Sequence, residues 1–232
     1  MSGGKVKLLA VDLDGTLVDS AADIAHCLGT ALEAVGLAAP GEASTRDWIG
    51  DGLETLIARA LAAATQAAPP GGCKQGTGAP TQLQAAALAA FLACYRDNLF
   101  TRSRLYPGAE ATLDALRARG VRLCCITNKR LGFSESLLEQ AGVRDRFELV
   151  LGGDSLPEKK PSPLPLTTAA RTLGVAPSAA TLVGDSHQDL HAARAAGFGF
   201  LFAGYGYGKV DAAELGSSPR IARFAELERL IA

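Results

Sequence analysis

The chain has 232 residues, of which 48% are hydrophobic, and it carries 23 Lys and Arg against 24 Asp and Glu. This composition supplies enough apolar side chains for a buried core and excludes a disordered chain. The formal net charge of -1 gives no basic surface, so we expect neither nucleic acid nor a membrane as a partner. The longest apolar stretch, Ala85–Tyr95, is far shorter than the roughly 18 residues that suggest a membrane span.

The N-terminal residues and the cysteines indicate in which cellular compartment the protein is expected. No long apolar segment precedes the first acidic residues, so we expect neither a secretory signal nor an anchor. The five cysteines are an odd number without a CxxC pair, which favours reduced thiols over a disulfide framework or a zinc site. We therefore expect a cytoplasmic protein. The cysteines are Cys27, Cys73, Cys94, Cys124 and Cys125.

Apolar runs alternate with helical patterns along most of the chain. Near-continuous apolar runs that end in Gly, Asn or Asp are typical of parallel strands covered on both faces. This alternation predicts an α/β fold with a doubly wound, mostly parallel, Rossmann-like sheet. The expected strands are Val6–Val11, Val121–Asn128, Phe147–Gly153, Ala180–Asp185 and Phe198–Gly204. The expected helices between them are Gly108–Gly120, Ser134–Gly142, Pro165–Gly174 and Asp189–Gly197.

One connection interrupts this alternation, because no convincing strand follows the first one until Val121. We interpret it as an inserted α-helical cap domain over residues 19–104, with the α/β core formed by residues 1–18 and 105–232. The Pro- and Gly-rich stretch Ala68–Pro80 splits the insertion and predicts an exposed, mobile loop. The expected helices of the insertion are Ser20–Gly36, Ser44–Ala63 and Thr81–Phe100.

Acidic residues follow the first expected strand in "VDLDGT", where Asp12 and Asp14 are two residues apart. Side chains at this spacing point the same way in a strand, and ligands of open α/β sheets bind at the carboxyl edge. Two neighbouring carboxylates repel unless a proton or cation lies between them, and Mg²⁺ prefers such hard oxygens. Asp and Gly are also ordinary turn formers, and "DSAAD" from Asp19 fits a capping box formed by Ser20 and Asp23.

Polar residues also follow the second and third expected strands. Thr127 and Asn128 offer a hydroxyl and an amide next to a helix start, where N–H groups favour anions, although a simple N-cap explains them equally well. Lys160 precedes a Pro-rich helix entry in which Ser162 is the expected N-cap and Pro163 the first helical residue. This entry would be a rigid mount for an ammonium group, whereas the alternative is a solvated surface lysine.

The fourth expected strand ends in "LVGDSHQD", where Asp185 repeats the position of the first acid and can be a third acid around a metal. Ser186 and Asp189 have capping-box spacing, so Asp189 is either a helix cap or an acid that orients the metal or the lysine. His187 and His191 are four residues apart but lack the HExxH pattern. We therefore expect exposed imidazoles rather than metal ligands.

The motifs "DLDGTLVDS", "ITNK", "KPSPLPL" and "VGDSHQD" follow one another in this order. Together they resemble the haloacid-dehalogenase-like hydrolases, specifically the phosphatases of that family, over nearly the whole chain. Within the family, "WIGDGLETLIARAL", "RLYPGAEATLDALRARG", "GGDSLPEKKPSPLPL" and "GYGYG" are similar to bacterial phosphoglycolate phosphatases. Gln188 departs from the pattern, since many relatives carry Asn there, and the Ala68–Pro80 stretch is longer than expected.

The resemblance implies Mg²⁺-dependent hydrolysis of a phosphomonoester through an aspartyl-phosphate. Asp12 would attack phosphorus, and Asp14 would protonate the leaving oxygen and then activate the attacking water. An acid at position 14 favours phosphoester chemistry over dehalogenation, because an alkoxide leaving group needs a proton. Mg²⁺ would be held by Asp12, Asp185 and the backbone carbonyl of Asp14. The phosphoryl group would be held by Thr127, Asn128 and Lys160, with Asp189 in a supporting role.

Substrate choice would come from the helical insertion, because the core motifs contact only phosphate and metal in this scheme. Arg46, Trp48 and Asp51 lie in its best-matching segment, and Arg46 can meet a small carboxylate or form a surface salt bridge. The resemblance favours 2-phosphoglycolate, a substrate of carbohydrate metabolism. The alternatives are a sugar phosphate, an amino-sugar phosphate, pyrophosphate, phosphomutase chemistry, or a binding protein without turnover. We expect a monomer or a homodimer whose cap closes about hinges near Asp19 and Arg104.

Overall fold

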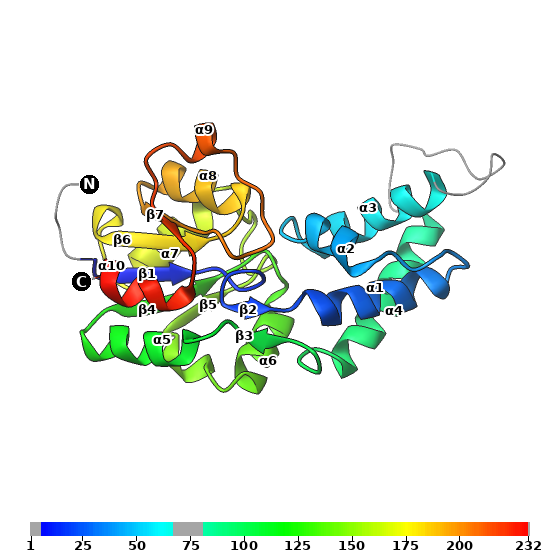
Figure 1. The fold of residues 1–232 in the computed structure, drawn as a ribbon, viewed down its shortest axis with the longest axis horizontal. Coiled ribbons are helices and arrows are strands. Elements are labelled where there is room, and N and C mark those ends of the chain that lie inside the picture. The colour runs from blue at the N-terminus through cyan, green and yellow to red at the C-terminus, as the bar shows by residue number, and fades with distance from the viewer. Residues whose placement is uncertain (1–5, 67–80, 232) are drawn as a thin grey trace. The chain divides into compact units, whose positions relative to one another are not determined.

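The structure is a computed structural model that describes residues 6–66 and 81–231 (Figure 1). The described chain divides into two compact units. The core unit contains the described residues up to Asp19 and from Arg104 onward, and the helical unit contains those of Ser20–Ser103. The stretch Ala68–Pro80, which the sequence predicts to be an exposed loop, lies outside the described residues.

The core unit is built around a parallel sheet that has six strands within the described residues, in the order β5-β4-β1-β6-β7-β8. Strand β1 (Leu8–Val11) lies near the centre, and all four of its apolar residues are buried. Burial on both faces explains why the sequence shows a continuous apolar run rather than alternation. The other strands are β4 (Arg122–Ile126), β5 (Leu149–Leu151), β6 (Ala180–Gly184), β7 (Gly199–Ala203) and β8 (Arg220–Ile221).

Helices cover both faces of this sheet, so the predicted doubly wound α/β fold is confirmed (Figure 1). One face packs against α7 (Leu164–Thr172) and α8 (His187–Ala196) through a core that includes Leu166, Leu190 and Phe200. Helices α5 (Ala109–Ala118) and α6 (Leu131–Gln140) lie on the opposite face in Figure 1. The parallel strands therefore all direct their carboxyl ends to one edge, where the candidate site forms.

Several short elements of the core unit were not predicted. Strand β2 (Val18–Asp19) pairs antiparallel with β3 (Arg104–Leu105), so the two chain crossings predicted as hinges are hydrogen-bonded to each other. The others are the 3-10 turns η1 (Arg144–Arg146), η2 (Pro177–Ala179) and η3 (Phe224–Glu226), the helices α9 (Ala212–Leu215) and α10 (Leu227–Leu230), and strand β8. Elements of two to four residues have too little periodicity to be recognised from sequence.

The described part of the helical unit contains α1 (Ala21–Glu33), α2 (Glu42–Trp48), α3 (Leu53–Gln66) and α4 (Gln82–Asp97). The prediction of one continuous helix over Ser44–Ala63 was wrong. Gly50 and Gly52 adopt φ values of 124° and 91°, which break the helix between α2 and α3. The sequence pattern did not show this break, because apolar residues at helical spacing continue on both sides of it.

Two predicted helix caps also differ from the structure. Ser20 precedes α1 but makes no side-chain capping bond, and Asp23 does not complete the predicted capping box. Both carboxylate oxygens of Asp23 instead accept hydrogen bonds from the backbone N–H of Arg102, and Oδ2 also accepts from the Ser103 N–H and hydroxyl. At α7 the N-cap is Pro163 rather than Ser162, whose hydroxyl accepts from the Leu164 N–H at 3.2 Å.

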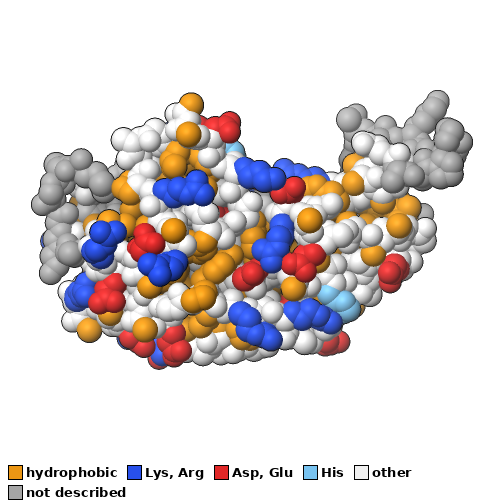
Figure 2. Space-filling model, viewed as in Figure 1, with side chains coloured by type: hydrophobic (Ala, Val, Ile, Leu, Met, Phe, Trp, Pro, Cys, Tyr) orange, Lys and Arg blue, Asp and Glu red, His pale blue; other side chains and the backbone are white. Residues whose placement is uncertain are grey.

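The surface and the thiols give further observations. In Figure 2, Lys and Arg side chains alternate with Asp and Glu side chains over the visible face of the core unit. No helix in the described residues has the length and hydropathy needed to cross a lipid bilayer. The cysteines in those residues carry free thiols, and the Sγ atoms of Cys27 on α1 and Cys94 on α4 lie 2.7 Å apart.

Candidate active site

Asp12 lies at the carboxyl end of the central strand, where the sequence places it. Its backbone N–H donates to the carbonyl of Val183 at 3.0 Å, so the pairing of β1 with β6 still fixes this residue. Its side chain is buried, and Asp14, two residues further on, is partly buried. The sharp turn that follows needs Gly15, which has a φ of 82° and would place a Cβ 2.3 Å from an oxygen of Asp185.

A buried lysine lies between two of the predicted acids. The ammonium of Lys160 donates to Asp12 at 2.7 Å, to Asp189 at 2.5 Å and to the backbone carbonyl of Ile126 at 2.7 Å. Burial tends to lower the pKa of Lys160, but the carboxylates of Asp12 and Asp189 outweigh burial and hold that pKa above its ordinary value. The surface-lysine alternative is therefore wrong, and the side chain carries a fixed positive charge in the interior.

Asp189 combines the two roles that the sequence left open. Its carboxylate accepts from the backbone N–H of Ser186 at 3.1 Å, while the Ser186 hydroxyl accepts from the Asp189 N–H, which completes a capping box at the start of α8. Its other oxygen contacts Lys160. The helix cap thus holds the carboxylate that anchors the lysine. Gln188 lies inside this first turn without preventing the capping box.

Asp185 is held by the glycine- and tyrosine-rich segment Gly204–Gly208. One of its carboxylate oxygens accepts from the backbone N–H groups of Tyr207 at 2.7 Å and Gly208 at 3.0 Å. A Cβ at Gly206 would lie 2.4 Å from the Asp185 side chain, and a Cβ at Gly208 would lie 1.8 Å from the Asp185 carbonyl oxygen. Glycine is therefore required at both positions by the close approach of this segment to Asp185.

The carboxylates of Asp12, Asp185 and Asp189 form a crowded buried cluster, in which one oxygen of each lies within 4.8 Å of the others. Burial raises the pKa of Asp12 to about 8, and the neighbouring charges of Asp189 and Asp185 add to this effect against the attraction of Lys160. Burial and Asp189 raise the pKa of Asp185 to about 7, against the two backbone hydrogen bonds.

This donor set fits a divalent cation with a preference for hard oxygens. Lys160 and Ser186 engage Asp189, which leaves Asp12 and Asp185 as the carboxylates best placed to bind a cation. Burial raises the pKa values of both carboxylates, and repulsion from the neighbouring acids adds to this effect despite the charge of Lys160. A second positive charge at this edge would stabilise the ionised carboxylates. Carboxylate oxygens are the ligands that Mg²⁺ prefers.

Lys129 was missed as a site residue, although it is the last letter of the "ITNK" motif. Its ammonium donates to both carboxylate oxygens of Asp14, at 3.0 and 3.1 Å, and the two side chains are 7% and 13% exposed. Nothing in a single sequence distinguishes this lysine from an exposed one. Only the turn after β4 brings it to the turn after β1.

Thr127 and Asn128 organise the same turn. The N-cap alternative for them is wrong, because α6 begins only at Leu131, after Arg130. The Thr127 hydroxyl accepts from the Lys129 N–H at 3.2 Å, and the Asn128 amide donates to the Lys160 carbonyl at 2.9 Å. Asn128 therefore joins the loops that carry the two lysines.

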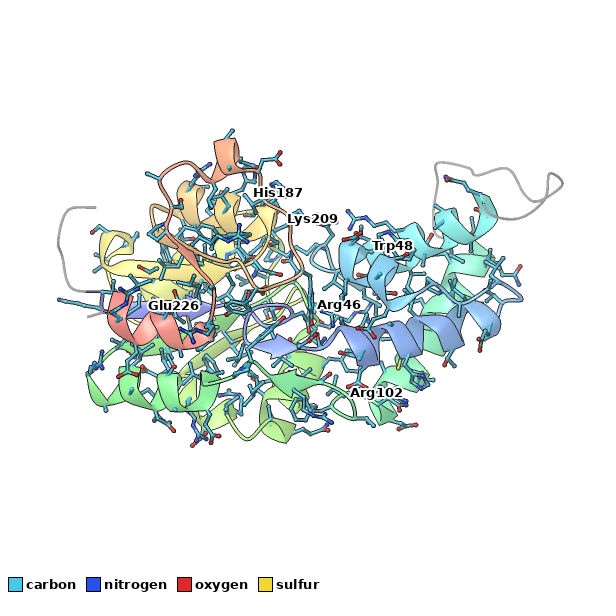
Figure 3. The ribbon with its side chains drawn as sticks, viewed as in Figure 1. Arg46, Trp48, Arg102, His187, Lys209 and Glu226 are labelled. Carbon is cyan, nitrogen blue, oxygen red and sulfur yellow. The ribbon has the colours of Figure 1, made fainter. Side chains whose placement is uncertain are left out.

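The candidate substrate residues of the helical unit lie on α2 and the break that follows it (Figure 3). Arg46 forms a salt bridge to Glu42 one turn earlier at 3.0 Å, which is the surface alternative that the sequence left open. Arg59 of α3 contacts the carboxylate of Asp51 and donates to the carbonyl of Trp48 at 3.1 Å. These contacts fix the shape of the break between α2 and α3.

The chain is similar to known proteins of one family. The family model for haloacid dehalogenase-like hydrolases matches residues 9–203. A phosphoglycolate phosphatase of Nitrosococcus oceani is 43% identical over 201 residues, which cover 87% of this chain and 85% of that protein. A phosphoglycolate phosphatase of Chromobacterium violaceum is 39% identical over 226 residues, which cover 97% of this chain and 96% of that protein.

A solved structure has the same architecture. The crystal structure of a predicted phosphoglycolate phosphatase from Haemophilus somnus 129PT has a TM-score of 0.88 and 34% sequence identity to this chain. The match covers 97% of this chain and 98% of that one. The similarity thus extends over both units of the chain.

Proposed function

The chain belongs to the haloacid dehalogenase-like hydrolases, as a phosphoglycolate phosphatase-like phosphoric monoester hydrolase, and we propose that it hydrolyses 2-phosphoglycolate through an aspartyl-phosphate. The observation that carries the mechanism is the buried Asp12 carboxylate at the end of β1, held 2.7 Å from the Lys160 ammonium. An attacking carboxylate and a fixed cation are thereby supplied together at the sheet edge.

In the first step, an oxygen of Asp12 attacks phosphorus and the bond from phosphorus to the ester oxygen breaks. The leaving alkoxide is a strong base, so Asp14 delivers a proton to it. Lys129, which donates to both oxygens of Asp14 in this structure, orients the carboxylate that remains after Asp14 has given up its proton. The product of this step is an acyl phosphate on Asp12 and a free alcohol.

In the second step, Asp14 accepts a proton from a water molecule that attacks the same phosphorus atom. The bond from phosphorus to Asp12 breaks, and the carboxylate and inorganic phosphate are regenerated. Lys160 supplies a positive charge before the reaction, because Asp12 and Asp189 hold its pKa above the ordinary value, and Asp189 remains its partner when Asp12 carries the phosphoryl group. Its charge, with donors from the loop of Thr127 and Asn128, stabilises the phosphoryl oxygens as charge shifts.

The cofactor that fits this site is Mg²⁺, which Asp12, Asp185 and the backbone carbonyl of Asp14 would hold. When bound, the ion supplies positive charge that offsets the repulsion between the nucleophile and the phosphate. Asp185 is positioned for this role by the Tyr207 and Gly208 N–H groups.

The substrate proposal rests on the names of the relatives, and Arg46 is the residue that we propose for the substrate carboxylate. The Arg46–Glu42 pair is exposed and joins residues one turn apart, a type of pair that contributes only about 0.3–0.5 kcal/mol. Its guanidinium can therefore exchange Glu42 for a substrate carboxylate at little cost. A small phosphorylated acid such as 2-phosphoglycolate presents that carboxylate, whereas most sugar phosphates do not.

Phosphate release with and without Mg²⁺ tests the chemistry. We expect Asp12→Asn to reduce kcat by on the order of a thousandfold or more, and EDTA to abolish turnover in the wild type. Asp114→Asn, an exposed acid on α5, is the matched control and should retain activity. Equal activity of all three proteins with and without Mg²⁺ would contradict the mechanism.

An acid-quench experiment tests the intermediate. Substrate labelled with radioactive phosphate should leave label on the wild-type protein that hydroxylamine releases, and no label on Asp12→Asn. Fully active enzyme that never carries such label would contradict the double displacement.

A substrate panel tests the specificity. We expect the highest kcat/KM for 2-phosphoglycolate, at least tenfold above sugar phosphates, amino-sugar phosphates and pyrophosphate. Arg46→Met should raise KM for 2-phosphoglycolate but not for p-nitrophenyl phosphate, which has no carboxylate. Arg96→Met, an exposed arginine of α4, is the control. A preference below tenfold would leave phosphatase activity intact but overturn the substrate assignment.

A further inference from the structure

A second cluster of metal-binding side chains lies on the surface of the core unit, outside the acidic site. His187 and His191 are one turn apart on α8, and Glu214 belongs to α9. The Nδ1 atom of His187 lies 2.6 Å from one carboxylate oxygen of Glu214, and the Nε2 atom of His191 lies 2.7 Å from the other. Figure 3 labels His187, the first residue of α8.

The fold positions Glu214 opposite the two histidines. Arg194, on the same helix as the histidines, donates to the backbone carbonyls of Glu214 at 2.5 Å and Leu215 at 3.3 Å. The Leu215 side chain is buried in the core that covers α8. A helix of four residues has little stability of its own, so these tertiary contacts keep the carboxylate in place.

The three ligand atoms are close enough to share one ion. Each residue offers one such atom, and all of these atoms lie within 4.8 Å of one another. The side chains of His187, His191 and Glu214 are 43%, 54% and 27% exposed, so the nitrogen atoms can exchange a proton for a cation from solution. Two imidazoles and one carboxylate form a three-ligand set that leaves positions for water, as in many zinc sites.

This chemistry differs from that of the acidic site. Imidazole nitrogen favours Zn²⁺ and neighbouring transition metals, whereas an all-oxygen set favours Mg²⁺. A simple pair of surface ion pairs is the alternative, and such pairs stabilise a fold only weakly. That alternative does not require both imidazoles to direct one nitrogen at the same carboxylate, as they do here.

We infer that His187, His191 and Glu214 form a second metal site, which binds a divalent transition metal such as Zn²⁺ and is separate from the Mg²⁺ site. An ion here would fasten α9 to α8. The chain between these helices includes Tyr207 and Gly208, whose N–H groups hold Asp185. The site would therefore stabilise the segment that positions Asp185, without taking part in hydrolysis.

Cobalt binding tests this inference. Metal-free full-length protein is titrated with Co²⁺ in excess Mg²⁺, which occupies the acidic cluster, and the d–d absorption of bound Co²⁺ is followed. We expect one Co²⁺ per chain in the wild type and about tenfold or more weaker binding in His191→Ala and Glu214→Gln. The third histidine of the chain, exposed His26 on α1, provides the control His26→Ala, which should bind Co²⁺ as the wild type does.

Thermal unfolding gives an independent measurement. Zn²⁺ should raise the Tm of the wild type and of His26→Ala, but not of His191→Ala or Glu214→Gln, and circular dichroism checks that each variant is folded. Co²⁺ that binds the two site variants as tightly as the wild type, or that excess Mg²⁺ displaces, would overturn the inference. Loss of the Co²⁺ absorption in His26→Ala to the same extent as in the site variants would also overturn the inference.

Discussion

Replacement of Lys160 by methionine should unfold the core unit more readily, because it leaves buried acids without their cation. Methionine matches the length of the lysine side chain but has no ammonium. The change removes the hydrogen bonds to Asp12, Asp189 and the carbonyl of Ile126. Lys159→Met, at the neighbouring and partly exposed position, is the matched control.

The magnitude follows from the burial of this cluster. Removal of one partner from a buried ion pair costs about 3–5 kcal/mol. The side chain of Lys160 is 2% exposed, against 10% for Asp12 and 0% for Asp189, so solvent screens these charges little. We therefore expect a loss of about 3–5 kcal/mol in the free energy of unfolding near pH 8.

The loss should also depend on pH with a defined sign. Burial already raises the pKa of Asp12 to about 8 in the wild type, and loss of the ammonium raises that pKa further. Asp12 of the folded variant then stays protonated where Asp12 of the wild type ionises, so the variant's deficit in stability grows as the pH rises through about 8. At lower pH a protonated carboxyl replaces the missing pair.

Urea unfolding in EDTA, followed by far-UV circular dichroism, measures this loss. A second variant that combines Lys160→Met with Asp189→Asn should be more stable than Lys160→Met alone, because it removes the unpaired charge of Asp189. A loss below about 1 kcal/mol at pH 8, close to the median for a surface pair, would refute the reasoning. A stability loss of Lys160→Met that does not depend on pH would also refute the reasoning. So would stability effects of Lys160→Met and Asp189→Asn that simply add in the double variant.

Three further predictions concern other buried groups. The Tm of the metal-free wild type should fall as the pH rises from about 4 to about 8, because the raised pKa values of Asp12 and Asp185 make the folded state bind more protons than the unfolded state. Saturating Mg²⁺ should remove this fall. A Tm that is independent of pH in EDTA would contradict the prediction. Asp23→Asn should destabilise the helical unit by about 2 kcal/mol, as measured by fluorescence of the single tryptophan. Burial tends to raise the pKa of Asp23, but the hydrogen bonds from Ser103 and Arg102 outweigh burial and lower that pKa. The stability advantage of the wild type should therefore disappear as the pH falls below about 4. Gly208→Ala should weaken activation by Mg²⁺ at least tenfold, because its Cβ would meet the Asp185 carbonyl at 1.8 Å, whereas Gly132→Ala in α6 meets nothing within 4 Å and should leave activation unchanged.

The fold was largely predictable because local sequence patterns indicate most of its strands and helices. Apolar runs such as Leu8–Val11 are buried on both faces and therefore lack alternation, which identifies parallel strands without knowledge of their partners. The strand ends then followed from Gly, Asn and Asp. The break at Gly50 and Gly52 was not predicted, because apolar residues at helical spacing continue on both sides of it. The short elements near the C-terminus were not predicted either, because two to four residues show too little periodicity.

The candidate site divides in the same way. The amino-acid sequence by itself determined which side chains stand at the strand ends, because a motif such as "DLDGT" lies within one strand and its turn. Only the tertiary structure decided their partners. Lys160 lies 148 residues from Asp12, and Lys129 lies 115 residues from Asp14, yet each pair is in contact. A charge becomes a buried ion pair only when the fold excludes water around it, and that environment is a property of packing rather than of sequence order.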